Sequence, residues 1–244
     1  MDECIGFSRR RFLIGMAGTA GVAAAGATLI GAATANAATD RDGTKVTPSE
    51  ALHHLKAGSL RWKSGHLEHR DYTPPGHDII HGQWPFAAIL SCADSRVNPE
   101  SVFDVRQGNL FNVRNAGNIA DEIAIGSLEY AVAVLKVPAI LVLGHGSCGA
   151  VVATQKAVTT GTMPGGDIDA IVDLIRPAIE RLPHDHTRAE AIRSNVQNSA
   201  QTLLYQSATI AKAVEAGKLR IAKAVYIIGS REVDFFAHYP AHAG

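Results

Sequence analysis

The pattern of apolar and polar residues predicts short buried strands that alternate with longer helices. Continuous apolar runs such as 86–91 and 138–143 are typical of strands that are covered on both faces in a parallel sheet. A tight turn at 229–230 precedes the last segment, so we expect the final strand to close one edge of the sheet. The predicted strands are residues 86–91, 110–113, 138–143, 224–228 and 232–236.

Helices are predicted between these strands and ahead of them. Thr47 can cap a first helix, with Pro48 at its first position and Glu50 completing a capping box. A second helix is expected at 121–135, with its apolar face formed by Ile123, Leu128, Ala131 and Leu135. Further helices are predicted from Cys148 to about residue 159, at 168–182 and at 187–216.

A polar stretch at 63–82, rich in histidine and proline, is predicted to be loop. Several histidines precede the sheet, and they raise the question of a second metal site. A solvated surface is favoured, because no carboxylate ligand pattern accompanies them. These histidines are His53, His54, His66, His69, His77 and His81.

The alternation of elements indicates an α/β fold with a mostly parallel central β-sheet flanked by helices and preceded by an amino-terminal helical arm. In open sheets of this kind, ligands gather beyond the carboxyl ends of the strands. Cys92 stands at the end of the predicted strand 86–91, and His145 follows the strand 138–143. Both residues are therefore expected at the ligand-binding edge. The dipole of the helix that Cys148 opens should favour its thiolate form.

Cys92, His145 and Cys148 form a ligand set for zinc. A catalytic zinc ion takes three protein ligands and keeps a fourth position for water, and two cysteines with one histidine are such a set. His145 and Cys148 can chelate from one turn, while Cys92 arrives from a separate element. The alternative is that the three are ordinary core residues. The remaining cysteine, Cys4, lies in a segment expected to be removed, so no disulfide framework is implied.

The first 37 residues have the features of an export signal. Residues 8–13 form a twin-arginine pattern, and an apolar run rich in Ala and Gly, without acidic residues, extends over 12–33. Ala35-Asn36-Ala37 offers a cleavage site. We therefore predict a twin-arginine signal peptide at 1–37 and a single domain at 38–244 in a periplasmic or secreted protein. The alternative is a retained membrane anchor, for which this composition makes a weak span.

The balance of acidic and basic residues limits the kinds of binding partner that we expect. The chain has 23 basic and 23 acidic residues, and no block of Lys or Arg stands out after residue 37. This balance argues against nucleic acid as a partner and against a stable membrane association once the signal is cleaved. The expected partner is a small molecule.

Four segments carry specific motifs, and they fall in the order and at about the spacing of one enzyme family. The segments are SCADSRVNPE (91–100), LFNVRNAGN (110–118), SLEYAV (127–132) and LGHGSCGAV (143–151). Together with the residues around them, from 83 to 152, they resemble the β-class carbonic anhydrases. The resemblance implies the fold of that family, Zn²⁺ as cofactor, and carbon dioxide and bicarbonate as substrates.

The resemblance also implies roles for individual residues. Asp94 and Arg96 would form the catalytic dyad, in which Arg96 keeps Asp94 ionised and Asp94 accepts a hydrogen bond from zinc-bound hydroxide. Gln83, Phe111 and Tyr130 match pocket residues of the plant-type subgroup, and the chain is identified as resembling that subgroup.

Two positions depart from the related patterns. Ala116 stands where plant-type enzymes place a larger aliphatic residue. Ile89 stands where the bicarbonate-inhibited subgroup has tryptophan, which argues against the regulatory bicarbonate site of that subgroup although Arg114 is present. The amino-terminal helix, ALHHLKAGSLRW at 51–62, resembles the helix that lies across a partner subunit. The resemblance therefore implies a homodimer or homotetramer.

The implied mechanism is reversible hydration of carbon dioxide to bicarbonate and a proton, by attack of zinc-bound hydroxide. Because two thiolate ligands cancel the formal charge of the metal, the bound water should be weakly acidic and activity should rise through alkaline pH. Two other functions fit the same residues. They are hydrolysis of carbon disulfide or carbonyl sulfide, and a non-catalytic zinc-binding scaffold, against which the intact Asp94 and Arg96 argue.

Overall fold

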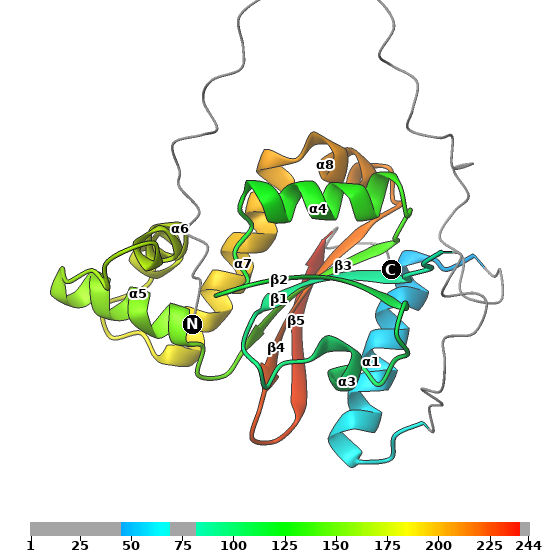
Figure 1. Cartoon of the computed structure of the whole chain (residues 1–244), viewed down its shortest axis with the longest axis horizontal. Helices are drawn as coiled ribbons and strands as arrows, with labels where there is room; N and C mark the ends of the chain where they lie inside the picture. Colours follow the sequence, from blue (N-terminus) through cyan, green and yellow to red (C-terminus); the bar gives the residue numbers. More distant parts are fainter. Residues whose placement is uncertain (1–44, 69–81, 240–244) are drawn as a thin grey trace, which may run out of the picture. The chain divides into compact units, whose positions relative to one another are not determined.

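The computed structural model describes residues 45–68 and 82–239, and their strands form one sheet (Figure 1). The strands are β1 (Ala87–Cys92), β2 (Leu110–Asn115), β3 (Ala139–His145), β4 (Arg220–Ile227) and β5 (Glu232–Tyr239). The strand order is β2-β1-β3-β4-β5, with the first four parallel and β5 antiparallel to β4. The predicted α/β fold, with a terminal strand at one edge, is confirmed.

Helices cover both faces of this sheet. One face is covered by α1 (Pro48–Ser64) and α3 (Pro99–Val102), and the other by α4 (Glu122–Ala133), α7 (Arg188–Gln206) and α8 (Ala208–Glu215). Helices α5 (Gly149–Thr160) and α6 (Ile168–Glu180) lie beside the sheet and pack against α7 (Figure 1). The pleat of β1 divides the core, because successive side chains point to opposite faces. Ala88 and Leu90 belong to the core beneath α4, α7 and α8, whereas Ala87 and Ile89 belong to the core beneath α1 and α3 (Figure 1).

The parallel pairing of β1 with β3 brings two candidate ligands to the same edge. Ser91 pairs with Leu143, so the two strands end side by side. Cys92 and His145 are the last residues of their strands, and every residue of both strands is buried. The structure extends the third predicted strand to include His145, because this residue still pairs with Tyr226 of β4.

Helix α1 begins as predicted. The hydroxyl of Thr47 accepts from the Glu50 N–H at 3.2 Å, and the Glu50 carboxylate accepts from the Thr47 N–H at 2.7 Å, which together make the predicted capping box. The loop begins two residues later than predicted, because Lys63 and Ser64 still belong to α1. The helix ends at Gly65, whose φ of +77° is a left-handed conformation that glycine adopts without a Cβ clash.

The single helix predicted at 187–216 is wrong. Ser207 has an extended backbone, with φ −113° and ψ 105°, and separates α7 from α8. Its hydroxyl accepts from the Ile210 N–H at 3.0 Å and donates to the carboxylate of Glu129 on α4 at 2.5 Å. The side chain of Ser207 thus starts a new helix and ties it to α4, which apolar periodicity alone does not reveal.

One position in the apolar face predicted for α4 is also wrong. Leu128 and Ala131 are fully buried, but the side chain of Ile123 is 78% exposed. The helix is capped by Asp121, and Ala124 rather than Ile123 continues the buried stripe one turn before Leu128. A single apolar residue in the first turn of a helix is therefore a poor guide to the orientation of that helix.

Gly58 lets α1 pack against buried backbone. A Cβ atom at Gly58 would lie 1.7 Å from the carbonyl oxygen of Phe103, a residue with no exposed surface. We expect Gly58→Ala to lower the free energy of unfolding by about 2–3 kcal/mol or more, because α1 must move away from Phe103. Denaturant unfolding measures this change. The control is Gly126→Ala in α4, where nothing lies within 4 Å of the added Cβ and a gain of up to about 1 kcal/mol is expected. Equal losses in the two variants would contradict the packing argument.

Several predictions fall wholly or partly outside the described residues. The signal peptide at 1–37 with its membrane-anchor alternative, the domain boundary at residue 38, and His69, His77 and His81 lie there. Of the other histidines, His53 and His54 are exposed on α1, and His66 is exposed just after it. A membrane-spanning helix is not found within residues 45–68 and 82–239, where every helix is too short or too polar.

Candidate metal centre

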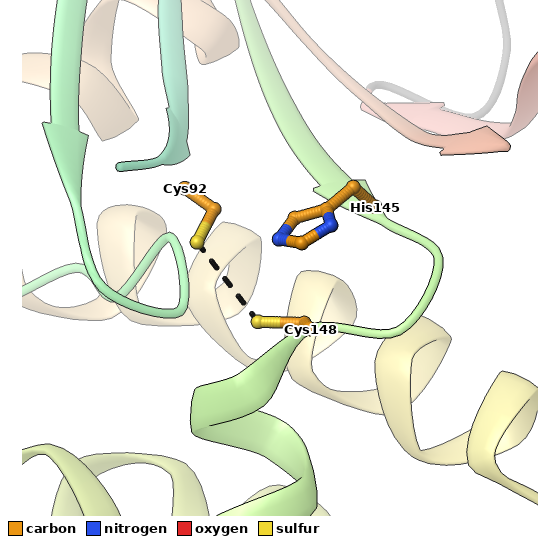
Figure 2. Close-up of side chains that lie close together, drawn as sticks. All are labelled: Cys92, His145 and Cys148. Atoms are coloured by element: carbon orange, nitrogen blue, oxygen red, sulfur yellow. Dashed lines mark hydrogen bonds between the residues drawn. The ribbon is translucent and has the colours of Figure 1, made fainter. Parts of the chain in front are cut away.

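Three side chains converge at the carboxyl edge of the sheet (Figure 2). Cys92 ends β1, His145 ends β3, and Cys148 is the N-cap residue of α5. Their ligand atoms lie within 4.8 Å of one another, and all three residues are buried. The structure thus brings together the three ligands predicted from the sequence, although 56 positions separate Cys92 from Cys148.

The imidazole of His145 presents a lone pair to this cluster. Its Nδ1 lies 3.0 Å from the carbonyl oxygen of Gly146, which can only accept, so Nδ1 carries the proton. Nε2 is buried and has no hydrogen-bond partner among the described residues. A buried nitrogen without a partner costs free energy, and a bound metal ion removes that cost. This nitrogen and the two sulfurs are ligands that zinc prefers.

The two cysteines interact directly. Their Sγ atoms lie 3.9 Å apart, a hydrogen-bond distance for sulfur. The hydrogen bond with Cys148 holds the pKa of Cys92 well below its usual range and raises the pKa of Cys148. Burial disfavours a charged His145, but the Cys92 sulfur, the Gly146 carbonyl and the Asp94 carboxylate together raise the pKa of His145. Cys92 is therefore the anionic member of the pair.

The start of α5 acts on the pKa of Cys148 in the expected direction, but the second sulfur opposes it. The N–H groups of Ala150 and Val151 at the start of α5 do lower the pKa of Cys148, as predicted. The hydrogen bond with Cys92 and burial of the thiol act in the opposite direction and exceed them. Proximity to a second sulfur is thus stronger here than the helix terminus.

Asp94 lies beside the cluster and is paired with Arg96. The guanidinium donates from Nε to Asp94 Oδ1 at 2.9 Å and from its terminal nitrogen to Oδ2 at 2.7 Å, and the Arg96 backbone N–H donates to Oδ1 at 3.0 Å. These bonds hold the pKa of Asp94 far below its usual value. Oδ2 lies 3.9 Å from His145 Nε2, so an ionised carboxylate faces the unpaired nitrogen. The structure thus brings the two predicted dyad residues together.

Arg96→Gln should raise the pKa of Asp94 toward the ordinary aspartate value of about 3.9, because the variant loses a charged, two-bond contact. A ¹³C NMR titration of the Asp94 carboxyl measures this shift. In the unmodified chain the folded pKa is depressed, so the stability from this carboxylate is present above the unfolded pKa and is lost as pH falls toward the folded pKa.

The control for this titration is Arg176→Gln, which removes a half-buried partner of the exposed Asp173 at 3.4 Å and should leave the Asp94 titration unchanged. If the pKa of Asp94 stayed equally low in Arg96→Gln, groups other than Arg96 would be responsible for it.

Two further residues hold the Cys92 segment. Arg114 on β2 donates from Nε to the carbonyl oxygen of Cys92 at 3.1 Å and from a terminal nitrogen to that of Asp94 at 2.8 Å. The backbone N–H of Gly117 donates to Cys92 Sγ at 3.4 Å. The sequence connects Arg114 only with a regulatory anion site and indicates no role for Gly117. The pairing of β2 with β1 could have indicated both residues, because it places the end of β2 beside Cys92.

Two of the three predicted pocket residues, Phe111 and Tyr130, line a cavity that the candidate ligands do not border. The rings of Phe111 and Tyr130 pack with centroids 6.1 Å apart and help to line an open cavity of about 870 Å³ between β2 and α4. Gln83 is exposed just ahead of β1. The lining of this cavity does not include Cys92, His145 or Cys148. The substrate-pocket role of the three residues stays a prediction.

The known proteins with similar sequences and structures reported below are all named carbonic anhydrases. Carbonic anhydrase 2 of Mycobacterium tuberculosis is 37% identical over 189 residues, covering 74% of this chain and 89% of that protein. The carbonic anhydrase of Mycolicibacterium smegmatis is 36% identical over 194 residues, covering 78% and 94%. The solved β-carbonic anhydrase CcaA has 25% identity and a TM-score of 0.58, covering 79% of this chain and 92% of that one. A family model described as "Carbonic anhydrase" matches residues 87–233. The chain belongs to the β-carbonic anhydrase family.

Membership of the β-carbonic anhydrase family confirms two expectations from the sequence, the fold and the enzyme class. The family is zinc-dependent, and the cluster of Cys92, His145 and Cys148 is a group that could hold this ion. All three residues fall within the matched range, as do Asp94 and Arg96. The plant-type subgroup, the export signal and the oligomeric state stay predictions.

Proposed function

We propose that this chain catalyses the reversible hydration of carbon dioxide to bicarbonate and a proton, with Zn²⁺ held by Cys92, His145 and Cys148. The observation that carries the proposal is the buried Nε2 of His145, which has no hydrogen-bond partner among the described residues and belongs to a group of ligand atoms all within 4.8 Å of one another. The relatives named carbonic anhydrase support the choice of substrate.

A zinc ion in such a site would supply a water molecule that loses a proton to solvent or buffer more readily than free water does, and the deprotonated form would be the nucleophile. The part of Asp94 is to orient that nucleophile. Its carboxylate is ionised and acceptor-only, so Oδ2 accepts a hydrogen bond from the attacking water and directs the water's lone pair toward the substrate carbon. Arg96 holds both carboxylate oxygens, which fixes the direction of this acceptor. Arg114 fixes the backbone that carries Asp94.

The assignment to the plant-type subgroup is part of this proposal. Its support is the match of Gln83, Phe111 and Tyr130 to that pocket and the absence of tryptophan at position 89. Ile89 is fully buried in the core between β1 and α1, so this position contributes packing and no polar group. These points favour a carbonic anhydrase without the regulatory bicarbonate site.

We also propose that the enzyme works as a homodimer or homotetramer. The support is apolar side chains exposed along α4, where Ile123 is 78%, Tyr130 47% and the adjoining Val134 38% exposed. Large apolar groups gathered on one helix are typical of surfaces that another protein covers. Sedimentation of the purified protein would give the number of subunits.

Export is proposed from the sequence alone. Residues 1–37 would direct a folded chain through the twin-arginine route, leaving residues 38–244 as the mature enzyme in the periplasm or outside the cell. Folding before export suits this site, because zinc bound in the cytoplasm protects both thiolates from oxidation. Amino-terminal sequencing of the exported protein tests the cleavage after Ala37.

Stopped-flow measurement of carbon dioxide hydration by the zinc-loaded protein tests the proposed reaction. Rapid turnover that rises through alkaline pH is expected. The same preparation is assayed with carbonyl sulfide and carbon disulfide. Turnover of a sulfur substrate with slow carbon dioxide hydration would replace the proposal with a sulfur hydrolase. One bound zinc ion without turnover of any of the three substrates would indicate a scaffold.

A further inference from the structure

The turn that follows β2 lies against the sulfur of Cys92. The buried N–H of Gly117 donates to Cys92 Sγ at 3.4 Å. At the start of the same turn, the carbonyl oxygen of Asn115 accepts from the Ala93 N–H at 2.9 Å. The turn, residues 115–119, therefore contacts both the sulfur of this candidate ligand and the backbone next to it.

The 115–119 turn is braced by its own first side chain. The amide of Asn115 donates from Nδ2 to the carbonyl oxygen of Ile119 and accepts at Oδ1 from the Ile119 N–H, both at 2.8 Å. Gly117 and Asn118 have φ angles of +83° and +47°. A left-handed conformation at a non-glycine residue persists where the surroundings enforce it. The direction of the Gly117 N–H thus depends on contacts that hold the turn in shape.

Helix α7 supplies such a contact. Asn195 donates from Nδ2 to the carbonyl oxygen of Gly117 at 2.8 Å, across 78 positions of sequence. Asn195 is 1% exposed, and its Oδ1 has no hydrogen-bond partner among the described residues. An apolar side chain would avoid burying that oxygen. The hydrogen bond to Gly117 is therefore the one contribution of Asn195 that an apolar residue could not make.

Helices α5 and α6 close the other approaches to Gly117. A Cβ atom added there would lie 2.6 Å from Ile175 Cδ1 of α6 and 3.1 Å from Ala150 Cβ of α5. The turn is thus packed against two helices and hydrogen-bonded to a third. The peptide group that carries the Gly117 carbonyl is also held by the Asn118 N–H, which donates to the carbonyl oxygen of Asn115 at 3.3 Å. Losing Asn195 therefore removes the shorter of two hydrogen bonds that fix the direction of this peptide group.

We propose that Asn195 is a positioning residue for Cys92, acting through the 115–119 turn. This inference rests on the proposed metal site. By fixing the conformation of Gly117, Asn195 keeps the Gly117 N–H aimed at the sulfur, which orients the thiolate and stabilises its charge. The sequence gives no sign of this role, since Asn195 is one polar residue in a long helix.

The test compares Asn195→Leu with Ser194→Ala in the full chain. Leucine has the same branched arrangement of four side-chain heavy atoms as asparagine, although its methyl groups are bulkier, and it removes both the donor and the unpaired oxygen. Ser194 is the matched control, because its hydroxyl donates to the carbonyl oxygen of Ala178 at 2.6 Å and joins α7 to α6 without touching the turn. Asn195→Ser, which is too short to reach Gly117, repeats the test if the leucine variant does not fold.

Two readouts are needed. Competition with a chelator gives the zinc dissociation constant, which we expect to rise roughly 10- to 100-fold in the Asn195 variants and less than about twofold in Ser194→Ala. Amide hydrogen exchange in the zinc-free protein should be about tenfold faster or more at Gly117 in the Asn195 variants alone. A merely structural role of Asn195 would speed exchange throughout α7 equally and leave Gly117 no more affected than its surroundings.

Unchanged zinc affinity and unchanged Gly117 exchange in a folded Asn195 variant would overturn the inference, as would equal effects in Ser194→Ala. Failure of the metal site itself is distinguishable, because the unmodified protein would then bind no zinc. In that case faster Gly117 exchange would still show that Asn195 fixes the turn, and the role toward a metal ligand would be withdrawn.

Discussion

Cys92→Ser is expected to lose its zinc ion and at least about a thousandfold of its carbon dioxide hydration activity. Serine has the size of cysteine, but its hydroxyl does not ionise near neutral pH and is a poor ligand for zinc beside one thiolate and one imidazole. The remaining His145 and Cys148 cannot make a three-ligand site. Metal analysis after dialysis and stopped-flow hydration measure the two losses.

Ser91→Ala is the matched control for Cys92→Ser. Ser91 is the neighbouring residue on β1, is fully buried, and has a hydroxyl without a hydrogen-bond partner among the described residues. Removal of an unpaired buried hydroxyl costs little, so this variant should keep its zinc and its activity. A Cys92→Ser protein that retained stoichiometric zinc and normal turnover would exclude Cys92 as a ligand.

Asp94→Asn is expected to lower kcat/KM by about 10²- to 10³-fold while zinc stays bound. The substituted side chain places an N–H₂ group where a carboxylate oxygen accepted hydrogen bonds, so this group would face either the donors of Arg96 or the nucleophile with the wrong polarity. The loss should appear mainly in kcat, since the interaction acts on the reacting water. Steady-state kinetics and metal analysis on the same sample separate the two effects.

The control for this charge removal is Asp121→Asn. Asp121 caps α4 by accepting from the Ala124 N–H at 2.7 Å, and asparagine is an equally good cap. Activity within about twofold of the unmodified protein is expected for this control. Full activity in Asp94→Asn would remove Asp94 from the mechanism, and loss of zinc in that variant would assign it to the metal site instead.

Patterns within short segments of the sequence are enough to predict much of the fold and the candidate ligands. Continuous apolar runs indicate the buried strands, and a parallel sheet then places the ends of β1 and β3 at one edge. That is why Cys92 and His145 could be paired in advance. Thr47 and Glu50 likewise set the start of α1 through contacts three residues apart. Predictions of this kind depend on neighbours in the chain.

The features that escaped prediction depend on contacts between distant segments. Asn195 lies on α7, which four other elements separate from Gly117 along the chain. Ser207 interrupts a helical pattern, and its hydroxyl donates to Glu129 on a different helix. The effect of Cys92 on the pKa of Cys148, which opposes that of the helix start, likewise comes from a contact between distant segments. Periodicity and motif spacing carry no information on such pairings, because nothing in either segment alone specifies its partner.

The placement of β3 between β1 and β4 has a consequence for the order of folding. A chain that has been synthesised only as far as α4 contains Cys92 but neither of the other two candidate ligands. The cluster closes only when β3 pairs with β1 across the intervening β2 and α4, a contact of high sequence separation that forms slowly. Metal uptake by a nascent chain would therefore mark the moment at which β1 and β3 have paired.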